Sequence, residues 1–332
     1  MLVMKLQIGI VGLPNVGKST LFNALTNAGA LAANYPFATI EPNVGIVPVP
    51  DERLDVLGKM YETEKIVPAT VEFVDIAGLV AGASKGEGLG NKFLAHIREC
   101  QAVCHVVRAF IDDDIVRADQ KVETDIVAQA KDDIDIINLE LQLADDETKE
   151  KIAAKRKKDP ADENIPFLTE KPVIYMFNVD EKGLTDSDLQ EKLCDLVAPA
   201  EAIFVNAKLE EEMSDMNREE RKEFLESYGV KDDALGELIK AAYKTLGLQS
   251  FLTAGKKECR AWTIKQGATA PEAAGTIHTD FERGFIAANI CNYDDLKELG
   301  SEQAVKAAGK LRTEGKTYVM QDGDVVEFKF NV

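Results

Sequence analysis

The sequence predicts an α/β fold, in which a doubly wound, mainly parallel sheet with a helical insertion precedes a small C-terminal α+β domain. Strand-like apolar runs at residues 6–11, 173–177 and 202–205 each end in a polar loop, as parallel strands do where they approach a ligand. A helical run follows the first strand, and shorter strand-like and helical runs alternate from residue 258 onward. The length of 332 residues allows two or three domains.

The loop after the first strand has the spacing of a phosphate-binding loop. Residues 12–19 read Gly-Leu-Pro-Asn-Val-Gly-Lys-Ser, and a helical run follows them. In such a loop the glycines let backbone N–H groups surround the β-phosphate, Lys18 neutralises β/γ oxygens, and the Ser19 hydroxyl can ligate Mg²⁺. We therefore expect a nucleoside triphosphate and Mg²⁺ to bind here.

Two further segments have the pattern of nucleotide switches. Thr39 lies in a proline-punctuated loop, where a hydroxyl can complete Mg²⁺ coordination when the γ-phosphate is present. The strand beginning at residue 70 ends in Asp-x-x-Gly, so Asp75 would hold a Mg²⁺-bound water and the Gly78 N–H would meet the γ-phosphate. The next segment has four glycines within residues 82–90, which favours a loop that orders only on a ligand.

Leu79 occupies the position after Gly78, where many switch proteins use a glutamine to orient the attacking water. A leucine can neither donate nor accept a hydrogen bond. Either Leu79 only packs against the switch, or another group or a partner positions the water. We therefore expect slow intrinsic hydrolysis, driven by charge stabilisation from Lys18 and Mg²⁺.

Two loops at strand ends are placed to bind the base, namely residues 178–181 (Asn-Val-Asp-Glu) and residues 206–208 (Asn-Ala-Lys). Guanine-specific switches have Asn-Lys-x-Asp in the first loop, whereas here Val179 and Glu181 occupy the Lys and Asp positions. Adenine has a lone pair at N1 and no 2-amino group, so a carboxylate there has nothing to accept. Glu181 is longer than Asp and displaced from the guanine-reading position, which weakens the case for GTP and favours ATP, although Glu181 could equally be a surface residue without a base contact.

Composition excludes several other classes. Five scattered cysteines without a C-x-x-C pair, and three distant histidines, suggest neither a disulfide framework nor a zinc site. A net charge of −19 opposes nonspecific coating of nucleic acid, and we expect no sequence-specific DNA partner. From residue 249 onward, 11 basic residues nearly balance 12 acidic ones, so the acidity belongs to the first part of the chain. Residues 149–158 carry six cations, which form either a solvated face or an RNA-facing tip.

We also expect a cytoplasmic protein without a membrane partner. Residues 1–5 lead directly into the first predicted strand without a secretory h-region. No later apolar run approaches the roughly 18 residues that a membrane span needs.

These motifs resemble the Obg-like ATPases of the YchF subfamily. The resemblance rests on residues 12–19, 75–91 and 178–181, and continues into that subfamily's TGS domain through residues 251–255, 260–263, 270–275, 278–286 and 321–326. It implies an OBG-type nucleotide-binding domain over residues 5–246, with a helical arm inserted at about 125–170. It also implies a β-grasp TGS domain over residues 247–332, Mg²⁺-dependent ATP hydrolysis, and association with the ribosome or its large subunit.

The resemblance also assigns roles to single residues of this chain. The nucleotide contacts are Gly12, Asn15, Val16, Gly17, Lys18, Ser19 and Thr20 for the phosphates, with Asn178, Val179 and Ala207 for the adenine. The metal residues are Ser19, Thr39 and Asp75, and the catalytic ones are Lys18 and Gly78.

Three departures from the family pattern stand out. The arm is short, because one helix over residues 139–158 is followed by a proline-containing return over residues 159–166. Ala287 stands where the family commonly has Arg, which removes one candidate RNA contact. The loop after the fourth strand contains Arg117 and no histidine, so we assign no catalytic role there.

Alternative functions remain open from sequence alone. A GTP-specific, translation-associated switch would share the phosphate loop, and so would a metabolite kinase. The kinase would need a lid and a second substrate pocket, which the switch motif and the TGS-like tail do not favour. The C-terminal part shows no catalytic constellation and is typical of a binding module. It is predicted to contain strands at residues 258–264 and 284–290, helices at residues 270–277 and 301–310, and two short strands around residues 322–323.

Overall fold

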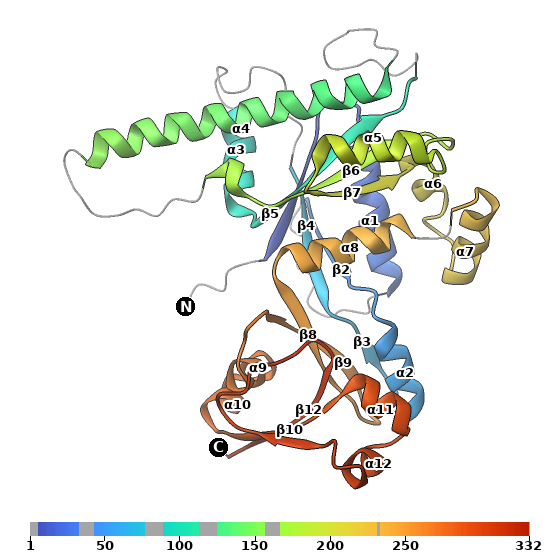
Figure 1. Cartoon of the computed structure of the whole chain (residues 1–332), viewed down its shortest axis with the longest axis vertical. Helices are drawn as coiled ribbons and strands as arrows, with labels where there is room; N and C mark the ends of the chain where they lie inside the picture. Colours follow the sequence, from blue (N-terminus) through green and yellow to red (C-terminus); the bar gives the residue numbers. More distant parts are fainter. Residues whose placement is uncertain are drawn as a thin grey trace. The chain divides into compact units, whose positions relative to one another are not determined.

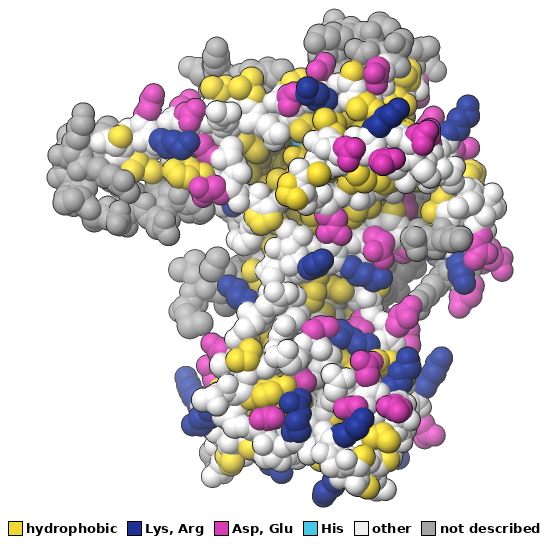
Figure 2. All heavy atoms as spheres, viewed as in Figure 1, with side chains coloured by type: hydrophobic (Ala, Val, Ile, Leu, Met, Phe, Trp, Pro, Cys, Tyr) yellow, Lys and Arg dark blue, Asp and Glu magenta, His cyan; other side chains and the backbone are white. Residues whose placement is uncertain are grey.

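The computed structural model describes residues 6–32, 43–76, 89–112, 125–156, 167–230 and 233–331. Its contacts divide the chain into two compact units, drawn in Figure 1. The first unit contains residues 1–47 and 71–242, and the second contains residues 48–70 and 243–332. Basic and acidic side chains are interspersed on the face shown in Figure 2.

The first unit is built on a six-stranded sheet in the order β2-β4-β1-β5-β6-β7. Its strands are β1 (Gln7–Val11), β2 (Val44–Pro48), β4 (Thr70–Asp75), β5 (Ala102–Ala109), β6 (Val173–Val179) and β7 (Glu201–Val205). The pairs β4–β1, β1–β5, β5–β6 and β6–β7 are parallel. Every position of β1 and β5 is buried, as expected for parallel strands covered on both faces. The predicted α/β class is confirmed.

Helices surround this sheet. They are α1 (Lys18–Ala32), α3 (Leu89–Glu99), α4 (Ile126–Arg156), α5 (Ser187–Val197), α6 (Ala207–Glu212), α7 (Arg218–Ser227) and α8 (Ala234–Thr245), with a 3-10 turn η1 (Leu168–Glu170). Side chains from α4 and α5, such as Ile134 and Leu193, form one hydrophobic cluster with Val107 and Phe177 of the central strands. This cluster covers one face of β5 and β6, and fixes the strands that carry the site.

The helix predicted at residues 139–158 begins earlier than expected. Helix α4 starts at Ile126 and spans 31 residues. Buried Asp145 on α4 accepts hydrogen bonds from the backbone N–H groups of Leu168 and Thr169, at 2.9 Å each. This carboxylate therefore holds η1 against α4 and directs the chain into β6.

The second unit contains a mixed sheet in the order β11-β10-β12-β8-β9-β3. Its strands are β3 (Ile66–Val67), β8 (Leu248–Thr253), β9 (Cys259–Lys265), β10 (Phe285–Asn292), β11 (Arg312–Glu314) and β12 (Asp324–Phe330). Antiparallel pairs join β10 to β11 and β12, and β8 to β9, whereas β12–β8 and β3–β9 are parallel.

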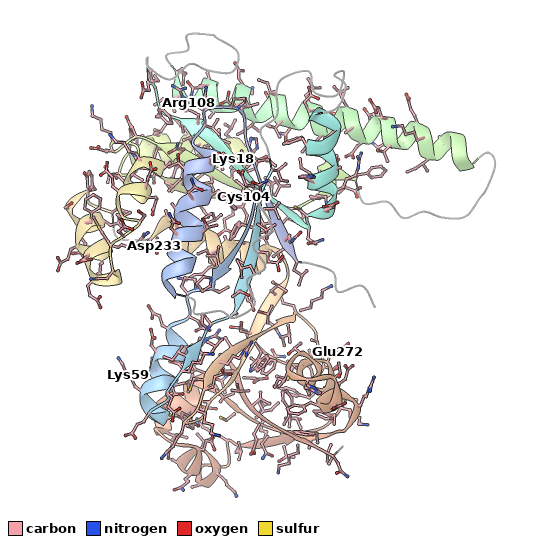
Figure 3. The ribbon with its side chains drawn as sticks, turned by 180° about the vertical axis from the view of Figure 1, so that it is seen from behind. Lys18, Lys59, Cys104, Arg108, Asp233 and Glu272 are labelled. Atoms are coloured by element: carbon pink, nitrogen blue, oxygen red, sulfur yellow. The ribbon has the colours of Figure 1, made fainter. Side chains whose placement is uncertain are left out.

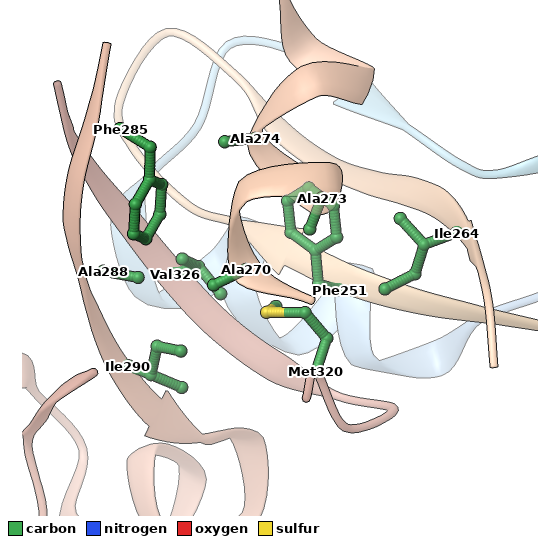
Figure 4. Close-up of a cluster of buried hydrophobic side chains, with 10 residues drawn as sticks. All are labelled: Phe251, Ile264, Ala270, Ala273, Ala274, Phe285, Ala288, Ile290, Met320 and Val326. Atoms are coloured by element: carbon green, nitrogen blue, oxygen red, sulfur yellow. The ribbon is translucent and has the colours of Figure 1, made fainter. Parts of the chain in front are cut away.

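Five helices accompany this sheet: α2 (Glu52–Tyr61), α9 (Ala270–Ile277), α10 (Thr279–Arg283), α11 (Tyr293–Leu299) and α12 (Glu302–Ala307). Helix α9 has the predicted bounds, because Thr269 and Glu272 form a capping box at its start. Its alanines pack on Phe251 and Phe285 of the sheet in the cluster shown in Figure 4. The predicted small α+β domain is confirmed.

Residues 48–70 fold with the C-terminal strands, whereas the predicted nucleotide-binding domain, residues 5–246, included them. Arg53 on α2 donates to Asp322 at 2.7 Å, and the Tyr61 hydroxyl donates to Glu302 at 2.6 Å. Strand β3 then extends the sheet by pairing with β9. These partners lie more than 200 residues away in sequence, so no local pattern indicates them.

Candidate functional site

The candidate site lies where β1, β5, β6 and β7 end. Because these strands run parallel, their carboxyl ends meet at one edge of the sheet, and their following loops converge there. Figure 3 labels Lys18, at the start of α1, and Arg108, near the end of β5. The phosphate loop and both predicted base loops therefore lie at this edge.

The phosphate loop joins β1 to α1 and needs its two glycines for different reasons. A side chain at Gly12 would place its Cβ 2.7 Å from the backbone oxygen of Val106, so β5 leaves no room for one. Gly17 has a φ of +91°, which L side chains rarely adopt, and a Cβ there would lie 2.4 Å from the Asn178 Nδ2. Asn15 also has a positive φ, at 64°. The loop therefore has the backbone reversal that exposes N–H groups to an anion.

Lys18 and Asp75 form an ion pair across the site. The Lys18 Nζ contacts the Asp75 Oδ1, and their side chains are 10% and 18% exposed. Lys18 opens helix α1, whereas Asp75 ends strand β4, and the two residues lie 57 positions apart in sequence. The predicted phosphate-binding cation and the predicted metal-holding carboxylate thus meet at one point. Ser19 and Thr20 follow Lys18 in the first turn of α1, with Ser19 exposed.

Asn178 connects three segments that are far apart in sequence. Its Nδ2 donates to the Val16 backbone oxygen at 2.9 Å, and its Oδ1 accepts from the Ala207 backbone N–H at 3.0 Å. The residue is 5% exposed, so both bonds are shielded from water. One amide therefore fixes the phosphate loop, the end of β6 and the start of α6 relative to one another.

Val179 and Ala207 flank this amide in different ways. The Val179 side chain is 1% exposed and belongs to the hydrophobic cluster beneath α4 and α5. An adenine contact at Val179, which stays a prediction, would therefore use backbone atoms. Ala207 is the first residue of α6 and would lie 3.4 Å from a Cβ placed on Gly17. It stands directly beside the phosphate loop.

The loop after Asn178 is short and exposed. Asp180 accepts a hydrogen bond from the Gly183 backbone N–H at 2.8 Å, which closes a turn. Glu181, at the position of the guanine-reading carboxylate, lies exposed within that turn. Of the two residues that distinguish this loop from a guanine-specific one, Val179 is therefore buried in the core and Glu181 is exposed.

Thr39, Gly78, Leu79 and Arg117 lie outside the described residues. Among the residues that are described, no group of three or more His, Cys, Asp and Glu side chains could hold a metal ion by itself. Oxygen donors are nevertheless present at the loop, since Ser19 and Asp75 supply a hydroxyl and a carboxylate. Such a donor set fits Mg²⁺ shared with phosphate oxygens, the usual arrangement at triphosphate sites.

Sequence reasoning missed Arg108, which is 4% exposed and pairs in register with Asn178. Its guanidinium donates to the backbone oxygens of Phe110 and Asp112, at 3.2 and 3.0 Å, and shapes the loop that leaves β5. An arginine inside an otherwise apolar strand was the available signal, because a buried cation needs specific partners.

Sequence reasoning also missed the support of α6. Asn206 caps the helix by accepting from the Leu209 N–H at 3.0 Å. Behind it, buried Glu210 pairs with Arg221 of α7 at 2.9 Å. The charged run around these residues gives no local sign that one carboxylate is buried.

Two family models match the chain. The model of the 50S ribosome-binding GTPases matches residues 7–140, and the C-terminal model of the YchF GTPases, described as a protein of unknown function, matches residues 248–331. No described helix has both the length and the apolar composition needed to cross a membrane.

Relatives match along the whole chain. A Bacillus subtilis protein named ribosome-binding ATPase YchF is 49% identical over 372 residues, covering 99% of this chain and 100% of the relative. Obg-like ATPase 1 of Pongo abelii is 43% identical, covering 98% and 92%. The first alignment is 372 positions long against 332 residues here, so that relative has at least 40 residues that this chain lacks.

Solved structures agree in fold. The YchF GTPase of Schizosaccharomyces pombe superposes with a TM-score of 0.85 at 36% identity, covering 98% of both chains. A GTP-binding protein of Pyrococcus horikoshii gives a TM-score of 0.64 at 19% identity, covering 98% of this chain and 100% of that one, and shows the fold alone.

Proposed function

The chain belongs to the YchF subfamily of Obg-like ATPases, and from this premise we propose that it is a Mg²⁺-dependent ATPase that acts as a ribosome-associated nucleotide switch. The observation that supports this most is the position of Asn178. Its amide joins the phosphate loop to both base loops, so one nucleotide could contact all three segments. Asn178 would then link the phosphate part and the base part of the site through one separate hydrogen bond to each.

The phosphates would bind to the backbone N–H groups of residues 12–20 at the start of α1, where the helix dipole favours negative charge. Lys18 would exchange its contact with Asp75 for β/γ oxygens. This exchange keeps the Lys18 cation paired in both states, which avoids a buried unpaired charge. Lys18 would also stabilise charge on the γ-phosphoryl group as it is transferred to water.

Mg²⁺, when bound, would neutralise charge that develops on the β/γ oxygens. Ser19 and Asp75 would hold it directly or through water, and Thr39 would add a hydroxyl. Asp75 is oriented for this role by its place at the end of β4, where its backbone N–H donates to the Asn43 oxygen at 2.8 Å. The Gly78 N–H would meet the γ-phosphate, as the sequence predicts.

ATP is proposed as the preferred nucleotide. The aspartate that accepts from guanine N1–H is replaced by the longer, exposed Glu181, and the lysine that accompanies it is replaced by buried Val179. A guanine at this site would lose the aspartate that accepts from its N1–H and 2-amino groups, a mismatch that specific sites use for strong discrimination. Adenine makes no such demand.

The ribosome, or its large subunit, is proposed as the partner, with a cytoplasmic location. The Bacillus subtilis relative is named a ribosome-binding ATPase, and it aligns with nearly the whole chain. We propose that residues 247–332 form a TGS domain that serves binding. Basic and acidic side chains are interspersed on the face of this unit in Figure 2, so recognition there would rely on shape and specific contacts more than on a basic surface.

The helical arm at about residues 125–170 is proposed to be a shortened version of the family's arm. At least 40 residues of the Bacillus subtilis relative have no counterpart here, which is a difference of the size that a truncated arm would give. Contacts made through a long arm would then be reduced in this protein.

Steady-state hydrolysis tests the proposed activity. Purified chain with Mg²⁺ and ATP should release phosphate at well below about one turnover per second, because Leu79 cannot orient water. Added large ribosomal subunits should bind the protein in a nucleotide-dependent way in sedimentation. The variant Lys18→Met should release no phosphate above background, which controls for contaminating ATPases. Many turnovers per second from wild type alone would rule out a slow switch.

A GTP-specific switch is the second candidate. One observation favours it, because the solved Schizosaccharomyces pombe relative is named a GTPase. The same hydrolysis assay with GTP in place of ATP separates the two candidates.

A further inference from the structure

Helix α6 carries one side of the nucleotide site but is only six residues long, from Ala207 to Glu212. So short a helix cannot hold its own orientation in water. Its first residue must nevertheless stay within hydrogen-bond distance of Asn178, since the Ala207 N–H donates to the Asn178 Oδ1 at 3.0 Å. Helix α6 packs on α1, and further contacts from beyond the site help to hold it.

Arg221 on α7 provides that support at two points. Its Nη2 donates to the Glu210 Oε2 at 2.9 Å, and its Nη1 donates to the Met213 backbone oxygen at 3.4 Å. Glu210 lies in the middle of α6, and Met213 is the residue that ends it. One planar guanidinium therefore donates hydrogen bonds both to a side chain of α6 and to the carbonyl at its end. A lysine could not do this with the same geometry.

Glu210 is buried, and Arg221 is largely covered. The Glu210 and Arg221 side chains are 3% and 15% exposed. Helix α7 begins with a capping box between Asn217 and Glu220, which fixes the turn that precedes Arg221. Asp233 lies 3.6 Å from the same guanidinium nitrogen and is 52% exposed, so it adds a weaker, solvated partner.

We propose that Arg221 and Glu210 are positioning residues for the base side of the nucleotide site, holding Ala207 against Asn178 through α6. This assignment rests on the proposed nucleotide-binding function. It separates the site into two parts, because the phosphates contact residues 12–20 whereas the base contacts the ends of β6 and β7. Loss of the pair should loosen the base part and leave the phosphate part intact.

The contact between Glu210 and Arg221 does not depend on the protonation state of Glu210. Burial raises the pKa of the Glu210 carboxyl to about 7, while Arg221 opposes that shift and Asp233 adds to it. Either protonation state keeps an oxygen that accepts from Arg221, so the contact itself does not depend on the charge of Glu210. The variant Glu210→Gln should therefore retain the hydrogen bond from Arg221, whereas Glu210→Ala should lose it.

The test compares two ligands on the same protein by calorimetry, namely ATP and inorganic tripolyphosphate, both with Mg²⁺. Tripolyphosphate reports on the phosphate loop alone, whereas ATP reports on both parts. For Arg221→Gln we expect ATP to bind about tenfold more weakly, the effect of losing one ordinary hydrogen bond, and tripolyphosphate to change by less than about twofold. Lys222→Gln, at an exposed position next to Arg221, should change neither.

The variants at Glu210 keep the test decisive if Arg221→Gln does not fold. Glu210→Gln should bind ATP within about threefold of wild type, and Glu210→Ala should weaken ATP about tenfold without weakening tripolyphosphate. Equal weakening of both ligands would show that the pair only stabilises the fold, and no weakening of either would show that α6 is held by other contacts. Both outcomes would overturn the proposal.

Failure of the proposed function is recognised separately. If wild-type protein bound ATP no more tightly than tripolyphosphate, no base contact would exist. That result would hold whatever the variants did.

Discussion

Gly17→Ala tests the arrangement of the site in two ways at once. The first cost is conformational, because an alanine must adopt a φ near +91°. A left-handed backbone costs a non-glycine residue about 1–2 kcal/mol. The second cost is steric, because the new Cβ would lie 2.4 Å from the Asn178 Nδ2. Asn178 cannot move away while it is bonded to both Val16 and Ala207.

The steric cost follows from those two bonds. Displacing the amide leaves at least one buried group unsatisfied, which costs about 1–3 kcal/mol. Together the two effects give a loss of about 2–5 kcal/mol, or a fall of roughly 4–20 °C in the melting temperature of the first unit. ATP affinity should fall at least tenfold, because the displaced amide connects both parts of the site.

Gly267→Ala is the matched control. Gly267 has a φ of +83°, and a Cβ there meets nothing within 4 Å. It should show only the conformational cost of about 1–2 kcal/mol, with ATP affinity unchanged. Adding Asn178→Ala to Gly17→Ala should cost less than the sum of the two single substitutions, because the clashing group is then absent. Differential scanning calorimetry and ATP titration measure both quantities. If Gly17→Ala were no more destabilising than Gly267→Ala, the reasoning about Asn178 would be refuted.

Three further predictions concern other parts of the molecule. Lys18→Met should weaken ATP binding by a factor of about 10² or more and remove the cation that faces Asp75, as titration calorimetry would show; near-wild-type affinity would contradict the assigned role. Burial lowers the pKa of His105 to about 3, so the folded chain binds fewer protons than the unfolded chain below pH 6.5, and stability should fall by about 1.4 kcal/mol per pH unit as the pH drops from 6.5 towards 3. His105→Leu should flatten this fall in urea midpoints measured at pH 7.5 and pH 5, whereas an unchanged slope would show that other groups cause it. Asp322→Ala removes acceptors from Arg53 and from a β8 backbone N–H, so it should lower the stability of the second unit by about 2–4 kcal/mol in thermal unfolding, and a loss below 0.5 kcal/mol would contradict the role of these bonds.

Local patterns were sufficient for much of the fold. The strands around the phosphate loop could be predicted because fully buried parallel strands are continuous apolar runs, and β1 is one. Helix α9 could be predicted with its bounds because its start carries a capping box and a proline at the first turn. In each case the deciding interactions lie within a few residues of the element.

Long-range contacts account for what could not be predicted. Residues 48–70 join the second unit through partners such as Asp322, 269 residues from Arg53, and neither side chain differs locally from a surface charge. The same holds at the site, where Asn178 was predicted as a base contact. The base contact stays a prediction, whereas the bonds of its amide to Val16 and Ala207 are revealed only by the folded arrangement.

Glu210 and Arg221 illustrate the same limit for function. They belong to a run rich in Glu and Arg that is typical of a solvated surface helix. Only the packing of α6 and α7 shows that Glu210 is 2% exposed. The part of a site that contacts the ligand directly can carry a motif, whereas the residues that support it follow from packing.

Titration of the purified chain with unlabelled ATP and GTP, with and without Mg²⁺, distinguishes the proposed ATPase from a GTP switch. We expect ATP to bind more tightly than GTP, binding to weaken when Mg²⁺ is removed, and Lys18→Met to weaken both nucleotides. Tighter binding of GTP would contradict the interpretation of Val179 and Glu181, and would make the protein a guanine-nucleotide switch.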